Sequence, residues 1–180
     1  MAVIAVFCAS SQMIDSRWLA IARAAGAALG ARGHELVSGG GRVGMMGALA
    51  EGARAAAGHT LGVIPQSLVD LEVADTAADE LVVTDGMAAR KIVMMERAHA
   101  FLILPGGLGT LDELFEVWTL ATLGLHRKPM VLLDVDGFYA GLIAWLEGLA
   151  RQRFVRAEGL DMVHVTRSVD EALDDIERFV

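Results

Sequence analysis

The sequence predicts a doubly wound α/β domain, in which a parallel sheet carries helices on both faces, within a single domain spanning residues 1–180. Apolar runs of strand length alternate with longer stretches in which apolar residues recur at helical spacing. The strand candidates are apolar throughout, as is typical of strands that are covered on both faces. A length of 180 residues with 54% hydrophobic residues suffices for one core.

The elements follow one another in regular alternation, and almost every apolar run ends in Gly, Ser or Asp. The predicted strands cover residues 3–8, 35–38, 60–64, 81–84, 100–104, 130–133 and 162–165. The predicted helices, rich in Ala, Leu and Arg, lie at residues 16–32, 43–57, 87–99, 110–123, 137–152 and 169–179. We find no repeat, linker or low-complexity segment that would divide the chain.

Composition excludes several classes of function. The 15 basic and 23 acidic residues give a net charge of −8, which argues against sequence-independent binding of nucleic acid or of an anionic membrane. The apolar runs are too short to span a bilayer, because Ser10, Asp134 and Asp136 interrupt them. No basic residue precedes the first run, so we expect a cytoplasmic protein. Cys8 is the only cysteine, and its apolar surroundings predict a buried, unreactive side chain.

Three turns between a predicted strand and the following helix are the candidate binding elements. They lie at residues 8–11, which include Ser10, at 38–44, which include Gly40 and Gly41, and at 104–110. In doubly wound sheets ligands bind outside the carboxyl ends of strands, and a helix N-terminus attracts anions. Together the turns predict a phosphate site, although glycine in any one of them could serve a purely steric purpose.

Known phosphate motifs fit poorly. Gly39, Gly41 and Gly44 match the dinucleotide pattern G-x-G-x-x-G, but residues 61–66 lack the acid that would bind the ribose hydroxyls. Residues 106–110 lack the Lys-Ser/Thr of a nucleotide triphosphate loop. The five histidines are not at metal-ligand spacing, so no metal is expected. The missing acid therefore argues against a dinucleotide-dependent oxidoreductase, which we keep as the second enzyme class.

Residues 105–113, PGGLGTLDE, resemble the PGGxGTxxE motif of the LOG ("lonely guy") family, the cytokinin riboside 5′-monophosphate phosphoribohydrolases. Four further segments resemble other blocks of that family in the same order. Residues 7–11 resemble its CGSS turn, 38–46 its YGGGxxGLM turn, 62–65 its GVIP strand end and 87–91 its MHxRK helix start. The resemblance covers about residues 2–150. Ser38 and Ala88 depart from it, at what we expect to be edges of the pocket.

The resemblance implies a Rossmann-like homodimer that needs no cofactor. Such an enzyme hydrolyses the N-glycosidic bond of an N6-modified AMP and releases the free base and ribose 5-phosphate. Arg90 and Glu113 would be its catalytic pair. The turns and the resemblance together assign substrate and phosphate binding to Ser10, Gly40, Gly41, Glu72, Lys91, Gly107, Leu108, Gly109, Thr110, Leu111, Asp112 and Thr119.

Each of these residues also has a plainer interpretation. Thr110 and Glu113 have the spacing of a capping box, which would satisfy the first backbone donors of a helix. Asp112 would be an acid favoured by the helix dipole. Arg90 would be a solvated charge on a helix, and Glu72 a solvated loop charge. A non-catalytic nucleotide carrier with the same fold is the alternative to an enzyme.

Some members of the family have been labelled lysine decarboxylases. A pyridoxal enzyme needs a Schiff-base lysine and an acidic partner for the ring nitrogen. Lys91 beside Arg90 does not by itself meet that requirement, so this activity is not expected.

Two helices carry more apolar residues than one sheet can cover. Residues 92–95 are Ile-Val-Met-Met in succession, and the later helix carries Val117, Trp118, Leu120, Leu123 and Leu125. We therefore expect these two helices to pack across the two-fold interface of a homodimer, close to the active site.

Overall fold

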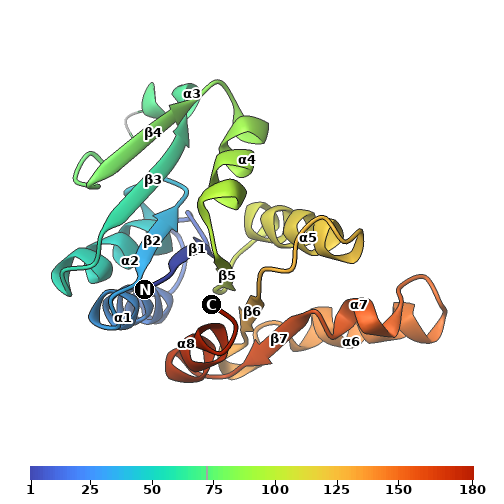
Figure 1. The fold of residues 1–180 in the computed structure, drawn as a ribbon. Coiled ribbons are helices and arrows are strands. Elements are labelled where there is room, and N and C mark those ends of the chain that lie inside the picture. The colour runs from blue at the N-terminus through green and yellow to red at the C-terminus, as the bar shows by residue number, and fades with distance from the viewer. Residues whose placement is uncertain (72) are drawn as a thin grey trace.

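A seven-stranded parallel sheet forms the centre of the molecule in the computed structural model, which describes residues 1–71 and 73–180 (Figure 1). The strand order is β4-β3-β2-β1-β5-β6-β7. The strands are β1 (Val3–Phe7), β2 (Glu35–Ser38), β3 (Thr60–Pro65), β4 (Glu80–Thr84), β5 (Ala100–Ile103), β6 (Met130–Leu133) and β7 (Val163–Thr166). This confirms the predicted fold class, and all seven predicted strands are present within one residue at each end.

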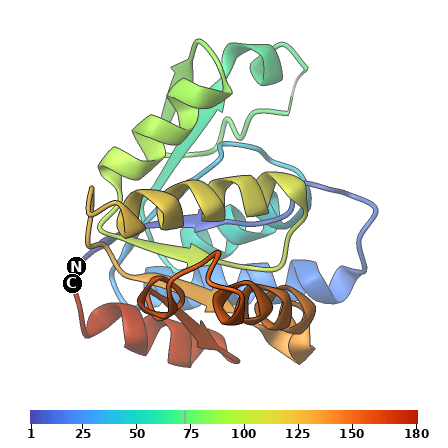
Figure 2. The same cartoon turned by 90° about the vertical axis from the view of Figure 1, so that its right-hand side faces the viewer.

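Helices cover both faces of the sheet, as Figures 1 and 2 show. They are α1 (Ser16–Ala31), α2 (Gly44–Ala55), α3 (Gln66–Val69), α4 (Met87–Arg97), α5 (Leu108–Thr122), α6 (Ala140–Arg151), α7 (Ala157–Leu160) and α8 (Val169–Glu177), with the 3₁₀ helix η1 (Val135–Gly137). Buried residues of α1, α2 and α8 share one core with alternate residues of the strands. The opposite core contains α4, α5 and the partly buried start of α6.

The differences from the predicted helices concern ends and short elements. The helix predicted at 137–152 begins only at Ala140, because Asp136 and Gly137 take left-handed conformations within η1. The helix predicted at 43–57 ends at Ala55, before Ala57 turns left-handed. The four-residue helices α3 and α7 were not predicted, since they are too short to show a helical period. No helix in the described part of the chain is long and apolar enough to cross a membrane.

The strand order brings distant segments together at the carboxyl edge of the sheet. The chain winds outward from β1 to β4 and then returns to place β5 on the other side of β1. The turns that follow β1, β2 and β5 therefore lie side by side at the point where the winding direction changes. This is where ligands bind in doubly wound sheets.

Candidate active site

A cavity of about 460 Å³ opens at this edge of the sheet. All three turns contribute to its wall, with Ser10 after β1, Gly41 after β2 and Gly107 after β5. Nine of the residues that the sequence assigned to the site line it: Arg90, Glu113, Ser10, Gly41, Gly107, Leu108, Gly109, Thr110 and Asp112. The cavity therefore joins residues from segments about one hundred positions apart in the chain.

Arg90 lies in the first turn of α4, and its side chain is held from two sides. It is only 6% exposed, and its Nε donates a hydrogen bond of 3.0 Å to the carbonyl of Val63 in β3. Its Nη1 lies 3.4 Å from Oε1 of Glu113. A Cβ atom on Gly39 would collide with the Arg90 guanidinium, so glycine at position 39 leaves the space that this side chain fills. Arg90 is thus a buried, fixed cation and not a solvated helix charge.

Glu113 lies in the second turn of α5, is 8% exposed and faces the same cavity. Burial raises the pKa of its carboxyl group to about 7, while the charge of Arg90 opposes the shift and that of Asp112 adds to it. A carboxyl group with a pKa near neutrality can take up or release a proton at working pH. A buried acid of this kind beside a fixed cation is typical of catalytic sites.

The capping box predicted for Thr110 and Glu113 does not form. Helix α5 begins at Leu108 and not at Thr110, and its N-cap is Gly107, which makes no side-chain capping bond. Thr110 therefore lies inside the first turn, and Glu113 is too far along the helix to reach the cap. A complete capping box occurs instead at Ser168 and Glu171, at the start of α8. The plain interpretation of Glu113 was wrong.

The N-terminus of α5 is open towards the cavity. The first intrahelical bond of this end runs from the N–H of Leu111 to the carbonyl of Gly107, so the N–H groups of residues 107–110 precede the helical ladder. A Cβ atom on Gly107 or on Gly109 would meet no atom within 4 Å. Protein packing therefore does not require glycine at either position. The open space leaves room for an anion to approach the backbone N–H groups.

Three of the assigned residues lie elsewhere. The ammonium group of Lys91 is 2.9 Å from Asp112 and 2.7 Å from Glu116, outside the cavity wall. These two carboxylates raise the Lys91 pKa. Leu111 packs against the core, and Gly40 packs against β3, with a left-handed backbone at φ +70° and a carbonyl that accepts from Asp75. Lys91 and Leu111 lie on helix faces that do not line the cavity, and the turn conformation of Gly40 directs it away from the cavity. Spacing along the chain does not reveal these orientations.

The other positions named from the sequence are Glu72, Ser38, Ala88 and Cys8. Glu72 lies outside the described residues. Ser38 is buried and Ala88 is exposed, and neither lines the cavity, although their neighbours Gly39 and Met87 do. Their expected place at the edges of the pocket therefore stays a prediction. Cys8 is buried as predicted, and burial raises the pKa of its thiol. It also lines the cavity, a position that the sequence analysis did not assign to it.

Sequence reasoning missed the apolar part of the wall. It consists of Val43, Met46, Ile64, Leu68, Val73 and Met87. The position of Ile64 near the carboxyl end of β3 was the available signal, since side chains there face the ligand edge. Residues 1–71 and 73–180 contain no group of three or more His, Cys, Asp or Glu side chains that could hold a metal ion.

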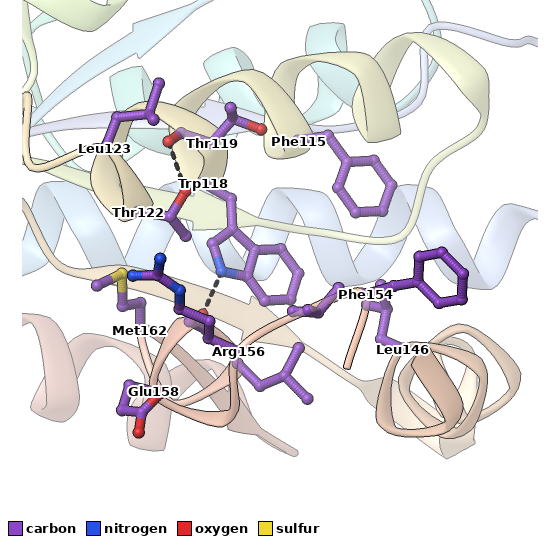
Figure 3. Close-up of a pocket in the computed structure, with 13 residues that line it drawn as sticks. Phe115, Trp118, Thr119, Thr122, Leu123, Leu146, Phe154, Arg156, Glu158 and Met162 are labelled. Carbon is purple, nitrogen blue, oxygen red and sulfur yellow. Dashed lines mark hydrogen bonds between the residues drawn. The ribbon is translucent and has the colours of Figure 1, made fainter. Parts of the chain in front are cut away.

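Thr119 lies in a second hollow, an apolar groove of about 800 Å³ between α5 and the segment from α6 to β7 (Figure 3). Phe115 and Trp118 stack on its α5 side with ring centroids 6.0 Å apart, and the Trp118 indole donates a 2.6 Å hydrogen bond to the carbonyl of Gly159. Leu123 and Phe154 border the groove and are 67% and 78% exposed. Thr119 is thus separated from the Arg90–Glu113 cavity within one chain.

Comparisons with known proteins agree with this architecture. A family model described as "Possible lysine decarboxylase" matches residues 46–176. The chain is 49% identical over 170 residues to a cytokinin riboside 5′-monophosphate phosphoribohydrolase of Mycobacterium tuberculosis, covering 94% of this chain and 90% of the relative. It is 36% identical over 177 residues to the rice enzyme of the same name, covering 98% and 73%.

Solved structures show the same fold at lower identity. The molybdenum cofactor binding protein of Rippkaea orientalis has a TM-score of 0.75 and 22% identity, covering 98% of this chain and 96% of that one. The molybdenum cofactor carrier protein of Chlamydomonas reinhardtii has a TM-score of 0.74 and 24% identity, covering 99% and 97%. At such identities the likeness concerns the fold alone.

Proposed function

Because the chain belongs to the LOG family of cytokinin riboside 5′-monophosphate phosphoribohydrolases, we propose that it hydrolyses the N-glycosidic bond of an N6-modified AMP. The products are the free base and ribose 5-phosphate. The observation that carries the proposal is the buried Arg90–Glu113 pair, 3.4 Å apart, beside the open N-terminus of α5.

The N-terminus of α5 binds the 5′-phosphate. The N–H groups of residues 107–110 and the helix dipole both favour an anion there, and Gly107 and Gly109 leave the approach open. Glu113 follows one turn later on the same helix. An anchored phosphate therefore fixes the ribose beside this carboxylate, and the fixed geometry lowers the entropic part of the barrier.

Glu113 acts in its ionised form. Cleavage passes through an oxocarbenium-like state at C1′ of the ribose, which a nearby carboxylate stabilises. The water oxygen bonds to C1′, and the base leaves with the electrons of the glycosidic bond. Glu113 accepts one proton of the water and passes it to the departing base nitrogen, so the neutral base is released and the carboxylate is regenerated. Arg90 favours the ionised carboxylate, against the effect of burial on the Glu113 pKa.

A lysine decarboxylase would need a lysine in this cavity. The chain has two lysines, Lys91 and Lys128, and neither lines it. Lys91 is bound by two carboxylates, and the ammonium group of Lys128 donates to the carbonyl of Met95 at 2.6 Å. The residues therefore do not fit a pyridoxal phosphate that is held as a Schiff base.

We further propose that the protein acts as a homodimer in the cytoplasm. Its negative charge and its lone, buried thiol are compatible with that compartment. For the dimer, Leu123 and Phe154 border an apolar groove that is large enough to receive part of a second copy. The prediction that Met94 and Val117 contribute to the interface was wrong, because both side chains are buried in the core of their own chain.

A substrate panel tests the activity. AMP and isopentenyl-AMP are incubated with the protein beside adenosine and isopentenyladenosine, and released base is quantified. We expect release from the monophosphates and much less from the nucleosides. Binding of monophosphates without release would favour a non-catalytic carrier, and equal turnover of AMP and adenosine would contradict the phosphate site.

A further inference from the structure

The turn that leads into α5 is tied to the neighbouring strand connection by one side chain. Tyr139 lies between η1 and α6 and is 3% exposed. Its hydroxyl donates a 2.7 Å hydrogen bond to the carbonyl of Leu104, directly after β5. A single phenol group thus links the start of this turn to the segment between η1 and α6.

Two backbone hydrogen bonds join this turn to β1 and to the turn that follows β1. The N–H of Leu104 donates to the carbonyl of Phe7 at 2.9 Å, and the N–H of Ala9 donates to the carbonyl of Pro105 at 3.3 Å. Pro105 has no N–H to donate. Backbone hydrogen bonds therefore hold the turn on the β1 side of β5. On the β6 side, the Tyr139 hydroxyl supplies the hydrogen bond. Without the hydroxyl, the buried carbonyl of Leu104 would lose this donor.

Tyr139 is itself firmly placed. Its N–H donates to Oδ1 of Asp134 at 2.7 Å, and the N–H of Asp134 donates to the carbonyl of Thr166 in β7 at 2.8 Å. The Phe138 ring meets the Tyr139 ring edge-on, with centroids 4.8 Å apart. Burial raises the Tyr139 pKa above its ordinary value, so the hydroxyl keeps its proton and remains a donor.

We propose that Tyr139 is a positioning residue for phosphate binding, whose hydroxyl fixes the turn at residues 104–107 and thereby the N–H groups at the start of α5. Tyr139 does not line the cavity, so it acts through the turn and not on the substrate. The inference rests on the proposed phosphate site at α5. It predicts that affinity for the phosphate depends on this hydroxyl, whereas recognition of the base does not.

The test compares Tyr139→Phe with the unaltered protein, since phenylalanine keeps the ring and removes only the hydroxyl. Calorimetry should show that ribose 5-phosphate binds up to about tenfold more weakly, a factor within the range of one lost neutral hydrogen bond. KM for AMP should rise by a similar factor with a smaller change in kcat, while the slow turnover of adenosine should stay the same.

Val163→Ala is the control, because Val163 lies in the same core cluster as Tyr139 but outside the cavity. It should lower the melting temperature without the selective loss of phosphate affinity. Unchanged ribose 5-phosphate affinity in Tyr139→Phe, or an equal loss for AMP and adenosine, would overturn the inference. Ribose 5-phosphate binding needs no turnover, so an inactive parent protein would contradict the proposed function and leave this comparison valid.

A second variant covers the case in which Tyr139→Phe does not fold. Asp134→Ala removes the acceptor of the Tyr139 N–H and leaves the hydroxyl in place. A smaller loss of ribose 5-phosphate affinity, in the same direction, is expected. A folded Asp134→Ala protein with full affinity would overturn the inference.

Discussion

The cavity at the strand ends and the groove along α5 differ in how their side chains are held. In the cavity, Arg90 and Glu113 are buried, and the contacts that place them come from the same chain. In the groove, Leu123 and Phe154 are large, apolar and mostly exposed. Helix α5 belongs to both, with its first two turns at the cavity and its later turns at the groove.

This difference separates two kinds of residue. A residue whose environment is completed by its own chain can be tested by small substitutions that leave the fold intact. Exposed apolar side chains that gather along one groove, unlike a single exposed apolar residue, mark a surface that another molecule covers. The two regions should therefore respond to different measurements, catalysis for the cavity and assembly for the groove.

The largest effect is expected for Glu113→Gln. The amide cannot accept a proton or stabilise an oxocarbenium ion by charge, so kcat should fall on the order of 10²-fold or more. Steady-state release of base from isopentenyl-AMP measures this. Monophosphate binding should persist, and Arg90→Ala should be similarly inactive. A Glu113→Gln protein that keeps half its activity would remove the carboxylate from the mechanism.

The same substitution should change how stability depends on pH. Because the folded-state pKa of Glu113 is raised to about 7 from 4.5, the folded protein binds this proton more tightly than the unfolded chain. Stability therefore falls as pH rises from about 4.5 through about 7, by at most about 1.4 kcal/mol per pH unit for one proton. Denaturant titrations at a series of pH values give the free energy of unfolding as a function of pH. This free energy should change less with pH in Glu113→Gln than in the unaltered protein, and an identical pH dependence would contradict the burial of this carboxyl group.

Gly39→Ala should follow, with a loss of at least about tenfold in kcat/KM. The added Cβ would occupy the place of the Arg90 guanidinium, which must then leave Glu113. Gly141→Ala is the matched control, since a Cβ on Gly141 in α6 meets nothing within 4 Å. If Gly39→Ala turns over substrate as fast as Gly141→Ala, the placement of Arg90 is not required for catalysis.

Gly109→Ala separates stability from binding. The Cβ would enter open space, so folding should be unharmed and the helix stabilised by up to about 1 kcal/mol. The same methyl group would crowd a phosphate at the start of α5, and KM for AMP should rise about tenfold. Thermal melts and steady-state kinetics measure the two effects. An unchanged KM would show that the phosphate does not bind at the start of α5.

The smallest effect is expected for a substitution in the groove, which should change the mass of the sedimenting particle by about a factor of two. Sedimentation of the unaltered protein should give twice the 19.1 kDa of one chain, and Leu123→Asp should give a single chain, because a buried carboxylate opposes association. Ala20→Asp, on the exposed side of α1, should remain a dimer. A Leu123→Asp protein that still sediments as a dimer would show that the groove is not the interface.

The fold and the location of the cavity could be predicted from sequence, because periodicity and turn glycines are local signals. The start of α5 was misplaced, since its cap is Gly107, which offers no capping side chain to recognise. Thr119 was assigned from the resemblance, but it lies on the later turns of α5, which border the groove and not the cavity. The contact of Arg90 with Gly39 and Val63 joins three segments, and no pattern within one of them indicates it.

The order of the strands also bears on how the protein acquires its activity. Phe7 in β1 pairs with Ile103 in β5, and closing so long a loop is slow compared with forming local structure. A growing chain on the ribosome therefore has no active site until the whole segment through α5 has emerged. Enzyme activity should accordingly appear late in refolding, together with the long-range strand pairing. The rate at which activity recovers therefore reports the rate of pairing between β1 and β5.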